Sequence, residues 1–256
     1  MKIVLIQSDI VWADPKANVA RTEAALQALP ADVDLIVLPE MFSTGFATQP
    51  EGVAEVEPGS TLQWMLRTAR RHNFAVAGSV AIEDVGAEGM PCFRNRFYFV
   101  KPDGSVEHYD KHHLFTYGGE HLRYSAGNER VVVEWRGVRF LLMVCYDLRF
   151  PCWSRNREDY DCALYVASWP TPRKAAWTAL LHARAIENQC YVVGVNRVGT
   201  DPYCHYSGGS VAIDPYGRDI VACADGQEGS AIAEIDMTAL AAFRDKFPVL
   251  KDRDMD

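Results

Sequence analysis

The chain has 256 residues, of which 48% are hydrophobic and 23% are charged, close to the averages of globular proteins. These proportions exclude disordered, collagen-like and low-complexity proteins, and a chain of this length can bury a large core without disulfides or metals. The formal net charge of -8 argues against a broad nucleic-acid-binding or anionic-membrane-binding surface. The sequence has no window of about 18 uncharged apolar residues, so no membrane-spanning segment is expected.

Seven cysteines are scattered through the chain, without repeated spacing and without a CxxC pair. This pattern is typical of a reduced protein rather than of a disulfide framework, so we expect a cytoplasmic location. The first residues, MKIVLIQSDIVW, lack the longer apolar region and the cleavage site of a signal peptide. No linker or internal repeat divides the chain, and residues 1–256 are expected to form a single domain.

The first part of the chain alternates apolar runs with helical patterns. Buried strands are expected at 2–7, 34–38 and 74–82, with helices starting at Asp14-Pro15 and covering 61–72. The first of these helices is expected to place Val19, Ala24, Leu26 and Leu29 on its apolar side. Residues 83–95 are rich in turn-forming residues, and we expect them to form an exposed hairpin loop.

The middle of the chain is predicted to form hairpins around an irregular stretch. Strands are expected at 95–101 and 105–109 around a Pro-Asp-Gly turn, and at 131–135 and 138–145 around Arg136-Gly137. The stretch 111–130 has no clear period and is long for a structureless loop, which itself indicates a function.

The last part of the chain returns to alternating strands and helices. It is predicted to contain the strongest helix at 174–189, a last helix from Asp236 to about Lys246, and strands at 162–167, 190–196, 207–213, 218–222 and 230–235. Helical segments mixed with hairpins predict an α/β or α+β sandwich with helices outside the sheets. The hairpins argue against a purely parallel, doubly wound sheet.

Three chemically reactive residues, Glu40, Lys111 and Cys145, stand at or just beyond the ends of predicted strands. Sheets of α/β proteins place reactive groups at the carboxyl ends of buried strands. Taken singly, each residue has a commoner explanation, since Glu and Lys are usually solvated loop residues and a strand Cys is usually a small core residue.

The sequence motifs around these three residues, taken together, are stronger evidence for a functional site. LPEMFSTGF at 38–46, YDKHHLF at 109–115 and VCYDLRFP at 144–151 resemble, in order and separation, the three signatures of the nitrilase superfamily of carbon–nitrogen hydrolases. The resemblance runs from Lys2 to about Phe247. It implies an α/β fold of the αββα four-layer sandwich type and homodimers that extend the sandwich across their interface.

The resemblance also implies a catalytic set of Glu40, Lys111 and Cys145. Cys145 would attack an amide carbon, Glu40 would take the thiol proton, and Lys111 with the backbone N–H of Tyr146 would stabilise the oxyanion. Ammonia would leave, and water would hydrolyse the remaining thioester. Glu120, in GGEHLRY, matches the second glutamate of the family, which positions the substrate amide and the catalytic groups; a surface loop acid is the alternative.

No metal or organic cofactor is implied, because the histidines and cysteines lack the spacing of zinc ligands. His112 and His113 adjoin Lys111, and we expect them to orient the loop or line the pocket without acting as catalysts. Asp147 and Arg149 follow the cysteine, and we expect them to pair with each other or with the loop in a structural role.

The stretch ASWPTPRKAAWTALLHARAIEN at 167–188 and the word PEMFSTGF resemble the bacterial omega-amidase group of this superfamily. That resemblance implies hydrolysis of the terminal amide of short dicarboxylic acid monoamides, such as 2-oxoglutaramate and succinamate. Arg173 is the candidate partner for the substrate carboxylate, with a helix cap or a surface position as the alternative. The candidates for apolar walls, which are equally candidates for the core, are Phe42, Phe46, Phe115, Tyr146 and Trp169.

Other functions remain open from the sequence. Nitrile hydrolysis, N-carbamoyl amide hydrolysis and general aliphatic amide hydrolysis would use the same three residues. A non-catalytic scaffold with the same fold belongs to a different class, but a scaffold would need none of Glu40, Lys111 and Cys145.

Overall fold

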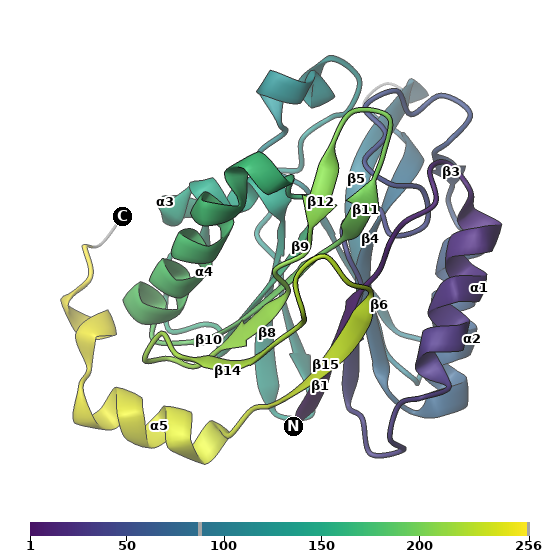
Figure 1. Ribbon diagram of the computed structural model, residues 1–256. Helices are drawn as coiled ribbons and strands as arrows, with labels where there is room; N and C mark the ends of the chain where they lie inside the picture. Colours follow the sequence, from purple (N-terminus) through teal and green to yellow (C-terminus); the bar gives the residue numbers. More distant parts are fainter. Residues whose placement is uncertain (87–88, 255–256) are drawn as a thin grey trace.

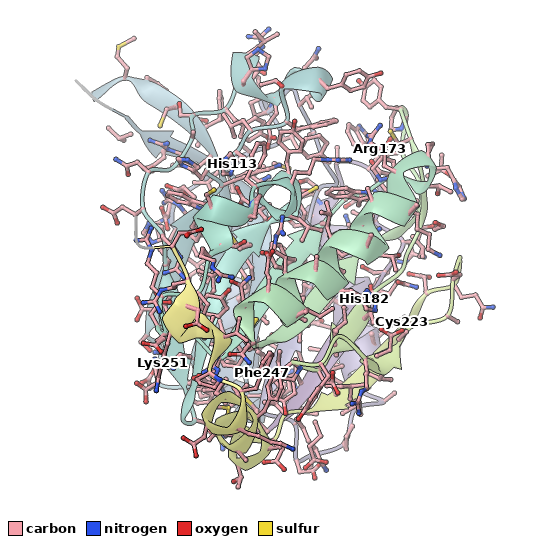
Figure 2. The ribbon with its side chains drawn as sticks, turned by 90° about the vertical axis from the view of Figure 1, so that its left-hand side faces the viewer. His113, Arg173, His182, Cys223, Phe247 and Lys251 are labelled. Atoms are coloured by element: carbon pink, nitrogen blue, oxygen red, sulfur yellow. The ribbon has the colours of Figure 1, made fainter. Side chains whose placement is uncertain are left out.

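The computed structural model describes residues 1–86 and 89–254. Two sheets lie face to face between layers of helices (Figure 1). Helices α1 (Pro15–Leu26) and α2 (Ser60–His72) cover the outer face of one sheet, and α4 (Lys174–Asn188) covers the other. The short α3 (Pro151–Ser154) lies beside α4, and Figure 2 looks onto α4 with Arg173 at one end and Phe247, after α5 (Met237–Lys246), beyond the other. The predicted αββα sandwich is confirmed.

The first sheet has the order β15-β1-β2-β4-β5-β6, with β3 paired to β4. Its strands are β1 (Lys2–Gln7), β2 (Leu35–Val37), β3 (Glu55–Val56), β4 (Ala75–Val85), β5 (Pro91–Val100), β6 (Val106–Asp110) and β15 (Gly229–Glu234). The parallel pairs β1–β2 and β2–β4 are joined by α1 and α2, since a parallel connection needs a crossover.

The second sheet has the order β14-β13-β10-β9-β8-β7. Its strands are β7 (Val132–Trp135), β8 (Val138–Val144), β9 (Cys162–Ala167), β10 (Tyr191–Asn196), β13 (Val211–Ile213) and β14 (Asp219–Ala222). Strands β8, β9 and β10 are parallel neighbours, so their carboxyl ends meet at one edge. A separate hairpin, β11 (Val198–Thr200) with β12 (His205–Ser207), stands above this edge (Figure 1).

The core has two layers, and β1 shows how the sequence divides them. Ile3 and Leu5 belong to the cluster between the sheets, whereas Val4 and Ile6 belong to the cluster under α1 and α2. Successive side chains of a strand point to opposite faces, so a continuous apolar run fits a strand buried on both sides. Between the sheets, Phe99 of β5 meets Phe140 of β8 with ring centroids 5.7 Å apart.

Three local predictions were wrong. Strands β4 and β5 pair as far as Val85 and Pro91, so most of the expected exposed loop at 83–95 is sheet; residues 87–88 of that stretch lie outside the described residues. The expected strand at 207–213 is divided by Gly208 and Gly209, whose φ values of 75° and 89° turn the chain between β12 and β13. Helix α1 exposes Ala24 and buries the polar side chains of Asn18 and Thr22.

Within the described residues, no helix combines the length and the apolar character needed to cross a membrane.

Candidate active site

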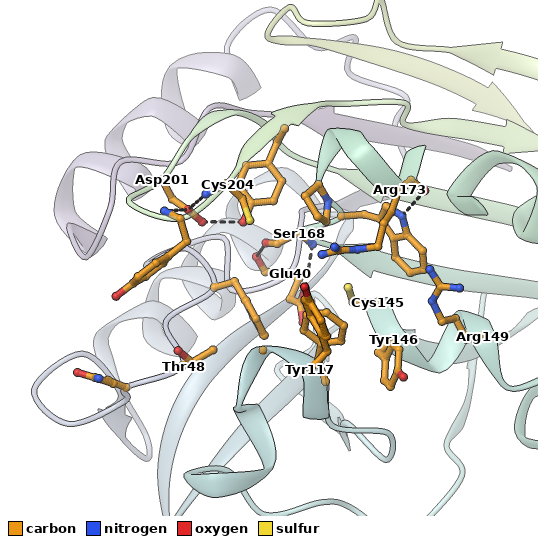
Figure 3. Close-up of a pocket in the computed structure, with 18 residues that line it drawn as sticks. Glu40, Thr48, Tyr117, Cys145, Tyr146, Arg149, Ser168, Arg173, Asp201 and Cys204 are labelled. Carbon is orange, nitrogen blue, oxygen red and sulfur yellow. Dashed lines mark hydrogen bonds between the residues drawn. The ribbon is translucent and has the colours of Figure 1, made fainter. Parts of the chain in front are cut away.

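A cavity of about 530 Å³ lies where loops of the first sheet meet the carboxyl ends of β8 and β9 (Figure 3). Seven residues named from the sequence for the site line it, namely Glu40, Phe46, Phe115, Cys145, Tyr146, Trp169 and Arg173. Its other walls include Arg149 and, from the β11–β12 hairpin, Asp201 and Tyr203 of the connecting turn and Tyr206 of β12. Residues more than a hundred positions apart in the sequence therefore share one cavity.

Cys145 stands at a bend of the chain. It directly follows β8 and begins the 3-10 helix η4 (Cys145–Arg149), with a φ of 46°. A positive φ is uncommon for a residue other than glycine and is typical of strained functional positions. Tyr146, in the first turn of η4, has a backbone N–H without an acceptor inside the helix, because the first N–H groups of any helix lack one.

The bend is held by buried hydrogen bonds. Asp147 Oδ2 accepts from the backbone N–H of Val144 at 3.0 Å and from the Tyr109 hydroxyl at 2.8 Å. The guanidinium of Arg184, on α4, donates to the carbonyl oxygen of Leu148 at 2.6 Å. Strand β8, η4 and α4 are thus tied together around the cysteine.

Beneath the cavity, a fully buried lysine joins two fully buried glutamates. Lys111, directly after β6, donates from Nζ to Glu40 Oε1 at 2.9 Å and to Glu120 Oε2 and Oε1 at 2.9 and 3.1 Å. Asn95, on β5, donates from Nδ2 to Oε1 of Glu40 at 2.8 Å and to Oε1 of Glu120 at 3.2 Å. The backbone N–H of Phe115 donates to Glu120 Oε2 at 2.6 Å.

Burial and charge set the protonation states of this cluster. Burial lowers the pKa of Lys111, but the charges of Glu120 and Glu40 outweigh it and hold that pKa above its ordinary value. Burial raises the pKa of Cys145 well above its ordinary value, and the charge of Glu40 adds to the effect while Lys111 opposes it. The resting site therefore pairs an ammonium group with a thiol rather than a thiolate, and the thiol needs a base to become a nucleophile.

Counting acceptor positions identifies which glutamate is free to take a proton. A carboxylate oxygen accepts two hydrogen bonds. Both oxygens of Glu120 already accept two each, from Lys111, Asn95 and the Phe115 N–H. In Glu40, Oε1 accepts two, whereas Oε2 accepts one from the backbone, the N–H of Ser168 at 2.8 Å, and keeps its second position for the cysteine. Glu40 Oε2 is thus the open proton acceptor beside Cys145 (Figure 3).

The two histidines next to Lys111 hold the loop and do not line the cavity. The His112 ring stacks on Trp153 with centroids 3.8 Å apart, and its Nδ1 lies 2.6 Å from the carbonyl oxygen of Gly127. The His113 ring stacks on Phe150 at the same spacing. Of the two roles expected for them, the structure gives them the orienting one.

Asp147 joins the loop that follows Lys111 to the bend at Cys145. Its Oδ1 lies 2.9 Å from Nδ1 of His113 and accepts from the backbone N–H of His113 at the same distance. Asp147 therefore pairs with the loop and not with Arg149, whose guanidinium lies over the Trp169 ring at 5.0 Å.

The aromatic residues expected to form the walls separate into two groups. The rings of Phe115 and Tyr146 meet edge to face in the cavity with centroids 5.1 Å apart. Phe42 is misplaced by the sequence prediction, because its ring packs against Trp64 of α2 in the core and does not line the cavity. The segment from Glu40 to Ala47 is irregular, so sequence spacing cannot tell which side chains face inward.

Two arginines give the cavity a positive wall. Arg173 lies over the rings of Phe115 and Tyr117 at 5.3 and 5.9 Å, and its side chain makes no capping bond to α4. In residues 1–86 and 89–254, neither Arg173 nor Arg149 has a carboxylate oxygen within 4.0 Å. The charge of Asp201 is already engaged, because it accepts from the Tyr206 hydroxyl at 2.6 Å and from two backbone N–H groups. The two guanidinium groups are therefore free to pair with an anionic group of a ligand.

Several site residues were not identified from the sequence. Asn95 and Ser168 bind the catalytic candidates, and the β11–β12 hairpin closes one side of the cavity. Asn95 carries one usable signal, since Asn is rare in the middle of a strand such as PCFRNRFYFV. Among the described residues, no group of three or more His, Cys, Asp and Glu side chains could hold a metal ion.

Comparisons with known proteins agree with this geometry. The family model described as carbon-nitrogen hydrolase matches residues 2–245. Omega-amidase YafV of Escherichia coli (strain K12) is 49% identical over 256 residues, which cover 99% of this chain and 97% of that protein. The 2-oxoglutaramate amidase of Bacillus subtilis (strain 168) is 36% identical over 254 residues, covering 98% and 96%.

Solved structures give the same result. XC1258 from Xanthomonas campestris, described as a CN-hydrolase superfamily protein with an arsenic adduct in its active site, superposes with a TM-score of 0.94 at 43% identity. That match covers 100% of this chain and 98% of the other. Nit3 of Saccharomyces cerevisiae, described as a member of branch 10 of the nitrilase superfamily, gives 0.89 at 25% identity, covering 100% and 97%.

Proposed function

The chain belongs to the carbon–nitrogen hydrolase family, as its sequence motifs predicted, and from that premise we propose that it is an omega-amidase. Its amidase relatives establish the coarser activity, hydrolysis of amides. The proposed reaction cleaves the terminal amide of short dicarboxylic acid monoamides, such as 2-oxoglutaramate and succinamate, to acid and ammonia. The observation that carries the substrate class is that Arg173, without a carboxylate partner among the described residues, lines the same cavity as Cys145 and Glu40.

In the proposed first step, Cys145 Sγ bonds to the amide carbon while its proton passes to Glu40 Oε2. The raised pKa of the thiol supports transfer during the attack, since little thiolate exists beforehand. The negative charge that develops on the amide oxygen is stabilised by Lys111 and the backbone N–H of Tyr146, and one such donor contributes about 3–4 kcal/mol to lowering a barrier.

The second half of the cycle regenerates the enzyme. Glu40 gives its proton to the departing nitrogen, the carbon–nitrogen bond breaks, and ammonia leaves a thioester on Cys145. Water then attacks the thioester and gives a proton to Glu40, which returns it to the cysteine sulfur as the acid departs. The full set of hydrogen bonds on Glu120 supports a role in fixing Lys111 rather than in moving protons.

A substrate panel read by ammonia release tests the substrate class. We expect 2-oxoglutaramate and succinamate to have the highest kcat/KM, above neutral aliphatic amides, N-carbamoyl amino acids and nitriles. A preference for a nitrile or a carbamoyl amino acid would replace the proposal by one of those two reactions. Equal use of acidic and neutral amides would make the protein a general aliphatic amidase.

Arg173→Ala is expected to raise KM for succinamate by roughly 10- to 100-fold, because a hydrogen bond to a charged group contributes about 1.5–3 kcal/mol. KM for a neutral amide of similar length, such as butyramide, should change by less than about threefold. Arg218→Ala is a matched control, since Arg218 also lies over a ring, that of Tyr216 at 4.7 Å, but outside the cavity. Equal losses for both substrates in Arg173→Ala would remove it from the carboxylate role.

Glu40→Gln is expected to lower kcat by roughly 10²- to 10⁴-fold, the range for loss of a general base. The amide that replaces the carboxylate has no oxygen able to take the thiol proton at neutral pH. Glu107→Gln, on the exposed side of β6, should leave kcat unchanged. Steady-state ammonia release at saturating succinamate is the measurement, and a Glu40→Gln rate within tenfold of the wild type would assign the base elsewhere.

We also propose that residues 1–256 form a single domain, that the protein is a homodimer, and that it is located in the cytoplasm. Two exposed apolar side chains, Ile186 of α4 at 54% and Phe247 after α5 at 60% exposed, support a partner protomer. Figure 2 shows Phe247 beyond one end of α4.

A further inference from the structure

Asn95 occupies the floor of the site although the proposed reaction assigns it no task. Its side chain is 1% exposed, and it extends from β5 between the two buried glutamates. Its backbone carbonyl oxygen accepts from the N–H of Lys111 at 2.9 Å, so it also fixes where the lysine leaves β6. Among the described residues, Asn95 Oδ1 is buried without a hydrogen-bond partner. Leaving an acceptor unpaired is unfavourable, so the amide nitrogen, not the whole amide, is what this position uses.

Four side-chain atoms form a closed ring beneath the cavity. Asn95 Nδ2 and Lys111 Nζ are the donors, and Oε1 of Glu40 and Oε1 of Glu120 are the acceptors, at distances between 2.8 and 3.2 Å. Donors and acceptors alternate, so each acceptor oxygen receives one hydrogen bond from the amide and one from the ammonium. The two carboxylates therefore meet only through donors.

Without these donors, two carboxylates at such spacing share a proton. Neighbouring carboxylates repel each other, and the usual result is that the pKa of one of them is strongly raised. Burial already raises the pKa of Glu120, and the charge of Glu40 adds to that rise while Lys111 opposes it. A proton held between the two acids would remove Glu40 as a base.

We propose that Asn95 is a positioning residue that keeps Glu40 and Glu120 ionised together, so that Glu40 Oε2 remains the proton acceptor of Cys145. An amide suits this task because it offers two N–H donors, carries no charge and does not titrate. The proposal rests on the proposed function for the role of Glu40. It differs from a structural role because it predicts a change in the pH at which the base becomes active.

The test compares Asn95→Ala and Asn95→Asp with the wild type in two assays. The first is kcat/KM for succinamate against pH. The second is the rate at which iodoacetamide alkylates Cys145 against pH, followed by peptide mass spectrometry so that the other cysteines do not interfere. Alkylation forms a bond from Sγ to carbon, releases iodide and passes the thiol proton to Glu40, so it reports the base without cleavage of an amide bond.

In Asn95→Ala, the acidic limb of both profiles should shift to higher pH by about one unit, which corresponds to a tenfold change in the proton affinity of the base. At neutral pH the loss should fall on kcat with KM unchanged, since Asn95 does not line the cavity. Asn95→Asp keeps the size of the side chain but adds a third carboxylate. The acidic limb of its profiles should therefore shift to a still higher pH. If the alanine variant does not fold, the near-isosteric aspartate variant still gives the answer.

Asn156→Ala is the matched control. Asn156 is equally buried and donates from Nδ2 to the carbonyl oxygens of Tyr160 and Asn188, away from the cavity. It should lower thermal stability without moving either profile. Asn95 variants that are slower but keep the wild-type acidic limb would overturn the proposal. If the wild type releases no ammonia from any amide, the proposed function fails, whereas the alkylation profiles still decide the role of Asn95.

Discussion

Cys145→Ala is expected to abolish ammonia release, with a loss of about 10⁵- to 10⁶-fold, the size seen when a catalytic nucleophile is removed. The substitution deletes only Sγ, at a residue that lines the cavity, so the fold should remain intact. Circular dichroism and thermal unfolding check the fold, and mass spectrometry of the wild type after rapid quenching checks for an acyl group on Cys145. Substantial turnover by folded Cys145→Ala would remove this residue from the mechanism.

Cys145→Ala should also change how the free energy of unfolding depends on pH. Because the pKa of Cys145 is raised in the folded protein, the unfolded chain loses the thiol proton first as the pH rises above the ordinary cysteine value of 9.0. The wild type therefore loses stability with rising pH in that range, and Cys145→Ala lacks this contribution. We expect the free energy of unfolding of the variant, relative to that of the wild type, to increase between pH 8 and about pH 10. Cys152→Ala, at an exposed cysteine outside the cavity, is the control.

Lys111→Met is expected to lower the free energy of unfolding by about 3–5 kcal/mol at neutral pH, because it leaves buried charges without their partner. Activity should fall by roughly 10²- to 10³-fold or more, since the oxyanion loses its cationic donor. Glu40 and Glu120 would then face each other with only Asn95 between them.

The pH dependence of the stability loss in Lys111→Met tests the charge argument directly. Without the lysine, the carboxyl pKa values in the folded protein rise above those of the unfolded chain, so the folded state binds more protons. The stability deficit should shrink as the pH falls from 7 towards the ordinary glutamate pKa of about 4.3. Urea titrations at several pH values measure it. Lys101→Met, which removes the outer pair with Glu107, should cost less than about 0.5 kcal/mol at every pH, and a constant deficit in Lys111→Met would contradict the charge argument.

The site residues predicted from the sequence are those that carry a local signal. Glu40, Lys111 and Cys145 each come just after a strand, and short motifs around them carry the family resemblance. Asn95 could not be found that way, because its partners Glu40 and Glu120 lie 55 and 25 positions away and meet it only after the sheets form.

The errors have the same cause. Phe42 and Phe46 are one helical turn apart in an irregular segment, yet the first enters the core under α2 and the second lines the cavity. Turn-forming residues at 83–95 suggested a loop, but hydrogen bonds between β4 and β5 outweigh local preference. The β11–β12 hairpin has strands of three residues each, too short for a period to be recognised.

The ring of Asn95, Lys111 and the two glutamates has an effect on the electrical balance of the buried site. At rest, two carboxylates, one ammonium and a neutral thiol sum to a single negative charge. When the thiol attacks and Glu40 takes its proton, the negative charge passes from Glu40 to the substrate oxygen, and the sum is unchanged. Lys111 is charged throughout, so the reaction moves one charge past a fixed cation instead of creating one in a medium of low polarity. The dipoles around the site can therefore keep their orientation through the whole cycle.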